Sequence, residues 1–314
     1  MSEMKKILAV AVGTERDRSI RARGGVNDVR PYIEGLVDGL AQRGHQLGTD
    51  YEIDYRERPH LDFKRGLGVE IFTTGDHDLI FAMSTTVAHL AQSAAEGTMP
   101  IVSVVSDTKA EHLNRKRNLT GISARRSQTA DQCFERFLAT VPTLKRVFVM
   151  NKPGYGPSDR AMKLVKAVAK KRGVTITSLS IKDFQTIERK IAALPKRDPA
   201  KPAVTGLFVL PIDACIAWGR QIIDTVQVGK NIPTFFPITD FVTPNSSSAL
   251  GAHGVPQRKC GELMSDYVDQ ILWQGKNPAS LRVAMADDDM FEWVISGAAA
   301  KSLNIKVPNV IQSA

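Results

Sequence analysis

The stretch DLIFAMSTTVAHLAQ, residues 78–92, changes its hydrophobic period part-way along. Residues 79–83 form a short apolar run that is typical of a buried strand. Four apolar residues then recur at the spacing of one helical face, namely Val87, Leu90, Ala91 and Ala94. The junction holds three consecutive hydroxyl residues, Ser84, Thr85 and Thr86. The pattern predicts a strand that passes through a short polar turn into a helix.

Two interpretations of the hydroxyl residues are open. Ser and Thr favour helix starts because a side-chain oxygen can accept one of the first-turn N–H groups, which have no partner inside the helix. The same N–H groups, together with the positive end of the helix dipole, also suit a carboxylate or another anion. A helix cap and an anion site are compatible, because the first turn has enough N–H groups for both.

Three segments of the first half of the chain recur in the same order in the second half. The matches are KKILAVAVG (5–13) with KRVFVMNKPG (145–154), DLIFAMSTTVAHLAQ with GLFVLPIDACIAWGR (206–220), and MPIVSVVSDT (99–108) with IPTFFPITDF (232–241). Each segment is an apolar strand that ends in a polar loop. The repeat predicts two related lobes.

Strands alternate with helices in each lobe, as shown by the helical stripe of Ile33, Leu36, Val37 and Leu40 after the first strand. Such alternation predicts an α/β fold with parallel sheets and right-handed crossovers. Ligands of open parallel sheets bind beyond the carboxyl ends of the strands. Polar residues follow those ends in both lobes: Gly13, Thr14, Ser84–Thr86, Ser106 and Asp107 in the first, and Asn151–Ser158, Asp213, Thr239 and Asp240 in the second. We therefore expect a ligand cleft lined by both lobes.

Composition is ordinary for a soluble globular protein. The chain has 314 residues, of which 43% are hydrophobic and 24% charged, and no segment approaches the length of a transmembrane helix. The formal net charge of +9 would suit nucleic-acid binding, but aromatic residues make up only 6% and none is interleaved with the basic cluster. Neither nucleic-acid binding nor direct membrane insertion is expected.

The basic cluster lies at residues 145–172, which hold nine basic residues and one acid. Most of these are on one predicted helix, SDRAMKLVKAVAKKRG (158–173). Its expected buried stripe is Ala161, Leu164, Val165 and Val168, and its expected outward residues are Lys163, Lys166 and Lys170. We interpret this face as a solvated helix surface.

No motif indicates a metal or cofactor site. Cys133 and Cys215 have apolar neighbours and are expected to be buried thiols, whereas Cys260 has no partner nearby in the sequence. The six histidines lack ligand spacing, and His89, one turn into the helix after Ser84, is expected to be a surface or packed residue. GxSxG, Walker, HExxH and GxGxxG motifs are absent.

Several motifs in a fixed order resemble one known family. They are DLIFAMSTTVAHLA, MPIVSVVSDTKAEHL, LTGIS, a strand ending in NKPGYGPS, GLFVLPIDACI, ITDF, ALGAHGV and KSLNIKVPNVI. Together they resemble the solute-binding proteins of ABC transporters, of the type I periplasmic binding protein class, in the subgroup that includes tryptophan and tyrosine binders. The resemblance covers the chain from about Lys5 to Pro308.

The resemblance implies two Rossmann-like lobes joined by three crossovers that close on a small solute. We expect residues 1–121 with 253–281 in one lobe and 122–252 with 282–314 in the other. The resemblance also implies ligand contacts from Thr14, Ser84, Thr85, Thr86, Ser106, Asp107, Asn151, Tyr155, Ser158, Asp213, Asp240 and Phe241. In this scheme Ser84 and Thr85 hold a carboxylate, and Asp213 and Asp240 pair with an amino group. An aromatic solute would need flat apolar partners, for which Tyr155, Phe236 and Phe241 are candidates if they are not ordinary core residues.

The sequence departs from the family in its first loop, GTERDRSIRARGGVNDVR (13–30), which is long and arginine-rich. Its arginines, Arg16, Arg18, Arg21 and Arg23, could clamp an anion, but nearby acids favour a solvated loop. Residues 7–12 are too few for the apolar core of a signal peptide and run directly into charge, so they are interpreted as the first strand. The family implies a periplasmic location, whereas the lack of a signal peptide implies a cytoplasmic one if the sequence is complete.

We expect a monomeric solute-binding protein that captures an amino acid or small carboxylate, possibly aromatic, for an ABC permease. A cytosolic sensor on the same fold is one alternative. A racemase-like enzyme is another, because Asp107 and Asp240 occupy matching places in the two lobes and could act as acid and base. A carboxylate in each lobe could equally bind the ammonium group of a ligand without catalysing any reaction.

Overall fold

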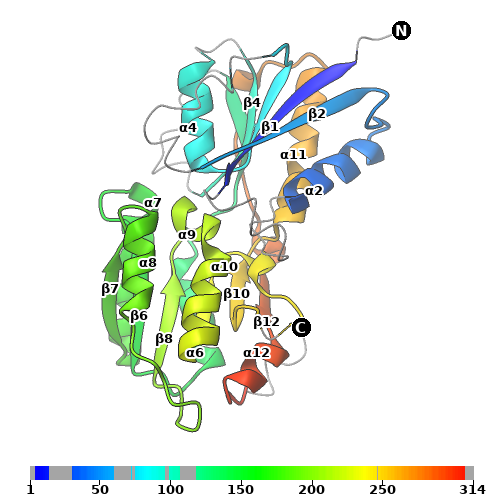
Figure 1. The fold of residues 1–314 in the computed structure, drawn as a ribbon. Helices are drawn as coiled ribbons and strands as arrows, with labels where there is room; N and C mark the ends of the chain where they lie inside the picture. Colours follow the sequence, from blue (N-terminus) through cyan, green and yellow to red (C-terminus); the bar gives the residue numbers. More distant parts are fainter. Residues whose placement is uncertain are drawn as a thin grey trace. The chain divides into compact units, whose positions relative to one another are not determined.

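The computed structural model describes residues 4–13, 30–59, 72, 75–95, 99–106, 118–245 and 247–307. The chain divides into two compact units, which we call unit 1 (Met1–Arg125 with Gln257–Asp287) and unit 2 (Arg126–Pro256 with Asp288–Ala314) (Figure 1). The chain therefore passes from one unit to the other three times. Each boundary lies a few residues after the position expected from the sequence.

Unit 1 is built on a sheet with the strand order β11-β5-β4-β3-β1-β2. Its strands are β1 (Lys5–Gly13), β2 (Tyr51–Pro59), β3 (Leu79–Ala82), β4 (Ile101–Val105), β5 (Leu119–Ser123) and β11 (Ala284–Met285). All its strand pairs are parallel, with Ile7 opposite Leu79 in the central pair. The helices among its described residues are α2 (Arg30–Gln42), α4 (Thr85–Ala94) and α11 (Gln257–Leu272), followed by the 3-10 turn η5 (Pro278–Ser280).

Unit 2 has the matching strand order β12-β10-β9-β8-β6-β7. Its strands are β6 (Arg146–Asn151), β7 (Thr175–Ser180), β8 (Thr205–Val209), β9 (Thr234–Phe236), β10 (Gly251–Gly254) and β12 (Glu292–Ile295), of which β12 alone is antiparallel to its neighbour. Its α-helices are α6 (Ala130–Thr140), α7 (Gly156–Arg172), α8 (Phe184–Ala192), α9 (Asp213–Ala217), α10 (Gly219–Ile222) and α12 (Gly297–Ser302). A π-helix, η3 (Ile223–Val228), continues α10, and short 3-10 turns form η4 (Thr239–Phe241) and η6 (Asp288–Met290).

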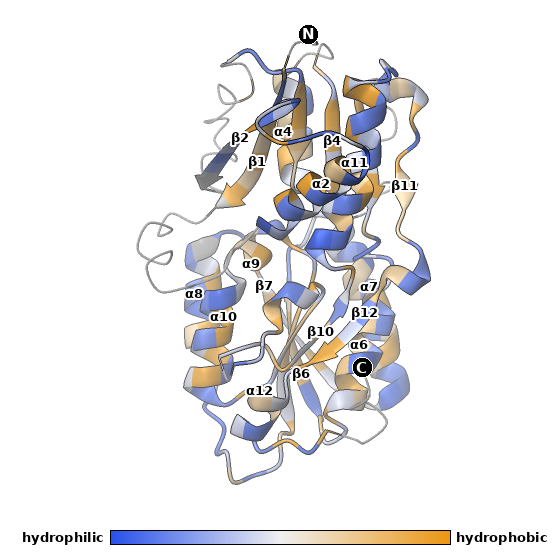
Figure 2. Cartoon of the chain, turned by 90° about the vertical axis from the view of Figure 1, so that its right-hand side faces the viewer, coloured by the Kyte–Doolittle hydropathy of each residue, from blue (hydrophilic) through white to orange (hydrophobic). Residues whose placement is uncertain are grey.

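The internal repeat predicted from the sequence corresponds to equivalent strands. The three matched pairs of segments form β1 and β6, β3 and β8, and β4 and β9, and the two members of each pair occupy the same place in their sheets. The predicted fold class, two mostly parallel α/β sheets, is confirmed. Amphipathic helices cover these sheets, and α8 and α10 carry mixed hydrophilic and hydrophobic residues in Figure 2.

Helix α2 packs against α11 through glycines in unit 1. A Cβ atom at Gly261 of α11 would lie 2.1 Å from the carbonyl oxygen of Tyr32, and one at Gly35 of α2 would lie 2.0 Å from the carbonyl oxygen of Arg258. The two backbones are therefore in direct contact, which any larger side chain would prevent. This contact fixes α11, a helix of the returning C-terminal segment, on the N-terminal part of the same unit.

Helix sidedness was predicted only in part. In α2, Leu36 and Leu40 are buried as expected, but the buried face continues through glycine positions, while Ile33 and Val37 are half-exposed. Similar shifts affect the other two predicted stripes: Leu90 and Ala94 of α4, and Leu164 and Val168 of α7, are half-exposed. The reason is that small residues (Gly35, Gly39, Ala88, Ala169) pack where the helices approach their neighbours.

The core of unit 2 contains a cluster of phenylalanines from α6 and two adjacent strands. Phe134 meets Phe208 edge-on at 5.1 Å between ring centroids, and Phe137 stacks on Phe235 at 5.1 Å. These rings are almost fully buried. Cys133 and Cys215 are buried free thiols, as predicted, and Cys260 is buried on α11.

We expect Gly261→Ala to destabilise the protein by about 2 kcal/mol or more, because the new methyl group would force α2 and α11 apart. Urea unfolding would measure the loss. Gly297→Ala is the matched control, because a Cβ there meets nothing within 4 Å. Equal stability of the Gly261→Ala and Gly297→Ala variants would contradict this account of the helix contact.

Candidate functional site

Each sheet has a topological switch point between its first and third strands. β1 pairs with β3 in unit 1, and β6 pairs with β8 in unit 2. The chain leaves β1 toward β2 at one edge of the sheet and leaves β3 toward β4 in the opposite direction, and β6 and β8 repeat this divergence. Loops that diverge in this way leave a crevice at the carboxyl ends of the two strands, where ligands of open α/β sheets bind.

In unit 1 this edge carries the hydroxyl residues predicted from the sequence. Ser84 is the N-cap of α4, and its Oγ accepts the Val87 N–H at 3.2 Å, so the predicted cap is confirmed. Thr85, with 1% of its surface exposed, uses its Oγ1 to accept the Ser106 N–H at 3.1 Å. That bond ties the end of β3 to the end of β4. Thr86, next to them on the first turn of α4, is half-buried.

In unit 2 the loop after β6 is held by side-chain hydrogen bonds. Asn151 Oδ1 accepts from the Ser178 hydroxyl of β7 at 2.5 Å. The Oγ of the fully buried Ser158 accepts the Lys152 N–H at 2.8 Å, and the Tyr155 N–H donates to the Lys152 carbonyl at 3.2 Å. Asn151 and Ser158 therefore fix the loop, and Lys152 is the residue whose backbone they hold in place.

The loop after β8 brings a carboxylate to the same edge. Asp213 is the first residue of α9 and is half-buried. Burial raises the pKa of the nearby Cys215 thiol far above its usual range, while the charge of Lys152 lowers that pKa and the charge of Asp213 raises it. Lys152 and Asp213 thus both lie close enough to Cys215 to influence it. The thiol itself is neutral and buried, which excludes it as a nucleophile.

The loop after β9 carries Asp240 and Phe241 on η4. Phe241 is 8% exposed; its ring lies 4.6 Å from that of Phe236, and a Cβ atom at Gly219 of α10 would overlap it. Phe236 is fully buried and belongs to the core. Asp240 is half-buried beside Phe241. The absence of a side chain at Gly219 is what lets the Phe241 ring lie against α10.

A buried glutamine fixes this loop, and the sequence analysis missed it. Gln227, in the π-helix η3, accepts with Oε1 from the Thr234 N–H (3.1 Å), the Thr234 hydroxyl (2.9 Å) and the Leu250 N–H (2.9 Å). Its Nε2 donates to the Ser248 carbonyl, and Ser248 Oγ accepts the Thr243 N–H at 2.8 Å. The stretch 222–228, IIDTVQV, does not single Gln227 out, because Asp224 and Thr225 are polar as well. π-helical turns frequently occur near functional sites.

Two predicted site residues, Thr14 and Asp107, lie outside the described residues, as do the arginines of residues 16–23. The structure brings the others into two groups, one at the carboxyl edge of each sheet. Ser84, Thr85, Thr86 and Ser106 form the group in unit 1. Asn151, Tyr155, Ser158, Asp213, Asp240 and Phe241 form the group in unit 2. The contact of each residue with a solute stays a prediction.

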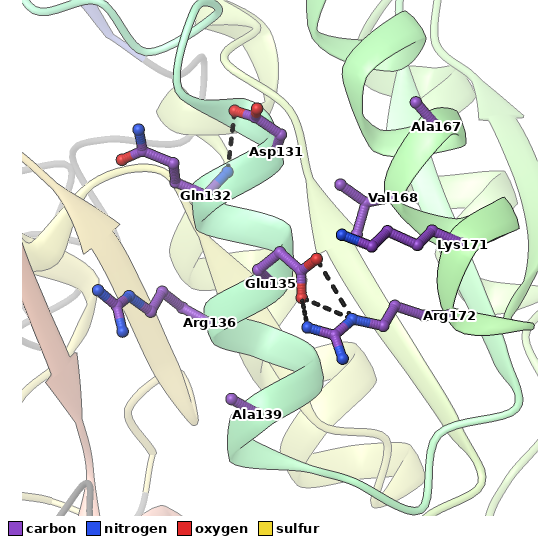
Figure 3. A pocket seen from close by; sticks show the side chains of 9 residues that line it. All are labelled: Asp131, Gln132, Glu135, Arg136, Ala139, Ala167, Val168, Lys171 and Arg172. Atoms are coloured by element: carbon purple, nitrogen blue, oxygen red, sulfur yellow. Dashed lines mark hydrogen bonds and ion pairs between the residues drawn. The ribbon is translucent and has the colours of Figure 1, made fainter.

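A groove of about 600 Å³ lies elsewhere, between α6 and α7. An ion pair crosses it, with Arg172 Nη2 2.6 Å from Glu135 Oε2, and Val168 and Ala139 lie in its walls (Figure 3). The lysines of α7 are exposed beside it, as predicted. The groove reaches the C-terminal ends of α6 and α7, which lead into the amino ends of β6 and β7, whereas ligands of open α/β sheets bind at the carboxyl ends. The topology therefore argues against this groove as the solute site.

The comparison with protein families agrees with the geometry. A family model described as "ABC transporter substrate binding protein" matches residues 28–314. The chain belongs to this family of ABC transporter substrate-binding proteins. A relative named tyrosine-binding protein, from Clostridioides difficile (strain R20291), is 22% identical over 279 residues, which cover 87% of this chain and 76% of the relative.

Solved structures of similar proteins share the fold of this substrate-binding protein. A conserved domain protein from Vibrio cholerae has a TM-score of 0.78 with 24% identity and covers 99% of this chain and 98% of its own. An ABC domain from Streptococcus pneumoniae in complex with L-Trp has a TM-score of 0.75 with 18% identity and covers 98% of each chain. Both the matched family and the matched relative are described as binding proteins.

Within the described residues, no cluster of three or more His, Cys, Asp or Glu side chains is arranged to hold a metal ion in this substrate-binding protein. None of its described helices is both long and apolar enough to cross a bilayer.

One buried titratable residue lies close to two of the unit boundaries. His253 of β10 is 7% exposed, and its ring stacks on that of Phe291 with 5.6 Å between the ring centroids. Trp293 is the partner of His253 in the β10–β12 strand pair. Arg136 of α6 lies 4.5 Å from the centroid of the Trp293 ring. Burial, with a smaller contribution from the charge of Arg136, lowers the pKa of His253 to about 4. His253 is therefore neutral in the folded protein at pH 7.

Thr85→Val should cost about 1–3 kcal/mol of stability, because it replaces the hydroxyl by a methyl group and leaves the buried Ser106 N–H without its acceptor. Chemical unfolding would measure this. Thr175→Val, at an exposed strand position, is the control and should change little. If Thr85→Val behaves like the control, the bond between the ends of β3 and β4 does not contribute to stability.

Stability should fall with acidification through His253. The unfolded chain binds a proton at the ordinary pKa of about 6.5, whereas the folded chain binds it only near pH 4, so stability is lost as the pH falls from 6.5 toward 4. Between pH 7 and pH 5 this loss amounts to about 2 kcal/mol. His253→Phe keeps a ring to stack on Phe291 and should reduce the pH dependence by that amount in urea unfolding. An unchanged pH dependence in His253→Phe would refute the assignment.

Proposed function

We propose that this substrate-binding protein captures an aromatic L-amino acid at its two switch points and delivers it to an ABC permease. The observation that carries the proposal is the placement of polar side chains at the carboxyl ends of strands in both sheets, namely Ser84, Thr85, Thr86 and Ser106 in unit 1 and Asn151, Asp213 and Asp240 in unit 2. The names of the relatives, a tyrosine-binding protein and a protein solved with L-Trp, support the aromatic amino acid as the ligand.

In this proposal the α-carboxylate binds at the first turn of α4. Ser84 Oγ accepts the Val87 N–H and so fixes the first turn, and the positive end of the helix dipole at this turn stabilises an anion. The side-chain conformation of Thr85 is fixed, because its Oγ1 accepts the Ser106 N–H. Its hydroxyl hydrogen is consequently available to donate.

The ammonium group binds to the carboxylates of unit 2, Asp213 and Asp240. A charged donor between carboxylates gives hydrogen bonds about twice as strong as those between neutral groups. A solute that contacts both units stabilises the closed conformation more than the open one. The permease then recognises the solute-bound protein by its closed conformation. The protein acts as a monomer outside the cytoplasmic membrane and does not transform the solute.

Binding of L-tyrosine or L-tryptophan should raise the melting temperature by several degrees. A ligand at 100 times its dissociation constant stabilises the folded state by about 2.7 kcal/mol. Differential scanning fluorimetry against the twenty amino acids, followed by titration calorimetry, measures the effect. The same amino acids with the α-carboxylate converted to an amide are the control, and they should bind at least tenfold more weakly.

A screen without a shift for any amino acid would contradict the proposal. NMR of tyrosine after incubation with the protein separates capture from catalysis, since a racemase or lyase would change the solute. A sensor that acts only with a partner protein would bind the amino acid equally well but fail to restore its uptake in cells that lack the permease's own binding protein.

A further inference from the structure

The net positive charge of the chain belongs to unit 2 alone. Unit 1 contains 21 lysine and arginine residues and 21 aspartate and glutamate residues, whereas unit 2 contains 21 basic and 12 acidic residues. Unit 1 is therefore neutral, and the formal net charge of +9 is that of unit 2. Such an asymmetry acts on association with charged partners rather than on the fold.

Helix α7 of unit 2 presents three lysines to solvent in one line. Lys163, Lys166 and Lys170 are exposed, and the buried face of the helix, which includes Val165 and Ala169, is on the other side. Residues three and four positions apart are neighbours on a helix surface, so these three lysines form a continuous line of positive charge, which we call the lysine row.

The lysine row is not neutralised within the protein. None of its ammonium groups forms an ion pair with a residue that the structure describes. The acid on the same helix, Asp159, accepts the Gly154 N–H at 3.0 Å, and Glu135 across the groove pairs with Arg172 (Figure 3). Like charges at this spacing repel one another and weaken a helix slightly. The row therefore does not stabilise α7 through its own contacts.

Exposed cations elsewhere in the molecule are paired with acids. In unit 1, Arg258 of α11 lies 3.6 Å from a carboxylate oxygen of Glu34 and 3.4 Å from one of Glu262. Arg43 lies 3.4 Å from Asp266. These pairs use their charges internally, whereas the charge of the lysine row is available to an external anion.

The helix dipole accounts for only part of the row. A cation in the last turn of a helix is stabilised by the negative end of the dipole, and this effect falls off within one turn. Lys170 lies in the last turn of α7. Lys163 and Lys166 precede that turn, so the dipole does not explain them.

The chemistry of this face favours a membrane surface over a protein or a nucleic acid. Protein interfaces are depleted in lysine and depend on aromatic or apolar anchors, and the one exposed apolar side chain of α7 is Ala167. A stacking surface for nucleotide bases needs aromatic residues, and α7 has none. A surface of anionic phospholipid attracts lysines by its diffuse negative charge and needs neither a pocket nor an anchor.

We propose that the lysine row holds unit 2 electrostatically against a membrane surface that contains anionic phospholipid. The contact uses charge alone and inserts no segment into the bilayer. It keeps the protein at the surface in which a permease lies. This inference goes beyond the capture of a solute and does not depend on the identity of that solute.

Flotation with lipid vesicles tests the inference. One set of vesicles contains equal parts of phosphatidylglycerol and phosphatidylcholine, and the other contains phosphatidylcholine only. The wild-type chain is compared with a variant that combines Lys163→Gln, Lys166→Gln and Lys170→Gln. The matched control combines Lys196→Gln, Lys201→Gln and Lys301→Gln, which removes the same charge from exposed lysines of unit 2 outside α7. Thermal unfolding shows that each variant is folded.

The wild-type chain should bind the vesicles that contain phosphatidylglycerol and not those of phosphatidylcholine, and added salt should weaken this binding. Neutralising the row should weaken it about tenfold or more, because each lysine near an anionic surface strengthens binding about fivefold. The control variant should bind nearly as well as the wild type.

Three results would overturn the inference. The first is that the wild-type chain fails to bind the anionic vesicles at low salt. The second is an equal loss of binding in the row variant and the control variant, which would assign the attraction to the overall charge of unit 2. The third is binding to a DNA duplex or to poly-L-glutamate, used in place of the vesicles, without binding to the vesicles.

Discussion

The divergence of the chain at two neighbouring strands is the constraint on which both sheets depend. The chain leaves β1 toward one edge of the sheet and β3 toward the other, and β6 and β8 repeat this arrangement in the second sheet. Right-handed crossovers then place the following helices on opposite faces. The loops must part above the strand ends, and the sequence fills that place with polar residues. The chemistry of the site is therefore a consequence of strand order rather than of any single motif.

Hydrogen bonds between side chains and backbone hold these loops at fixed positions. Thr85 joins the ends of two strands, Ser158 fixes the backbone of Lys152, and Gln227 joins β9 to Leu250, which directly precedes β10. A solute that binds to such loops does not have to order them first, which lowers the entropic cost of binding. Several predicted contact residues thus act as supports for the site, whether or not they also touch the solute.

Local patterns in the sequence predicted what depends on neighbouring residues. The strands of the repeat, the cap at Ser84 and the buried thiols of Cys133 and Cys215 follow from apolar runs and from hydroxyl residues at a helix start. Contacts between distant segments were beyond such patterns. The buried glycine face of α2 exists because α11, from the far end of the chain, packs on it, and nothing near Gly35 indicates this partner.

The same limit applies to Lys152. In the sequence it is one of nine basic residues between positions 145 and 172, and only the pairing of β6 with β8 separates it from the solvated lysines of α7. Its closeness to the Cys215 thiol, which the charge of Asp213 also influences, depends on the sheet and not on spacing along the chain. A residue that directly follows a central strand of a parallel sheet deserves a different interpretation from one on an exposed helix face.

Hydrogen–deuterium exchange with and without saturating L-tyrosine tests the location of the solute site most directly. We expect the ligand to slow exchange in the first turn of α4, in the loop after β6 and in the loop after β8, with no change along the exposed face of α6 and α7. Protection confined to the groove between α6 and α7, or a bound ligand that protects neither switch point, would contradict the account.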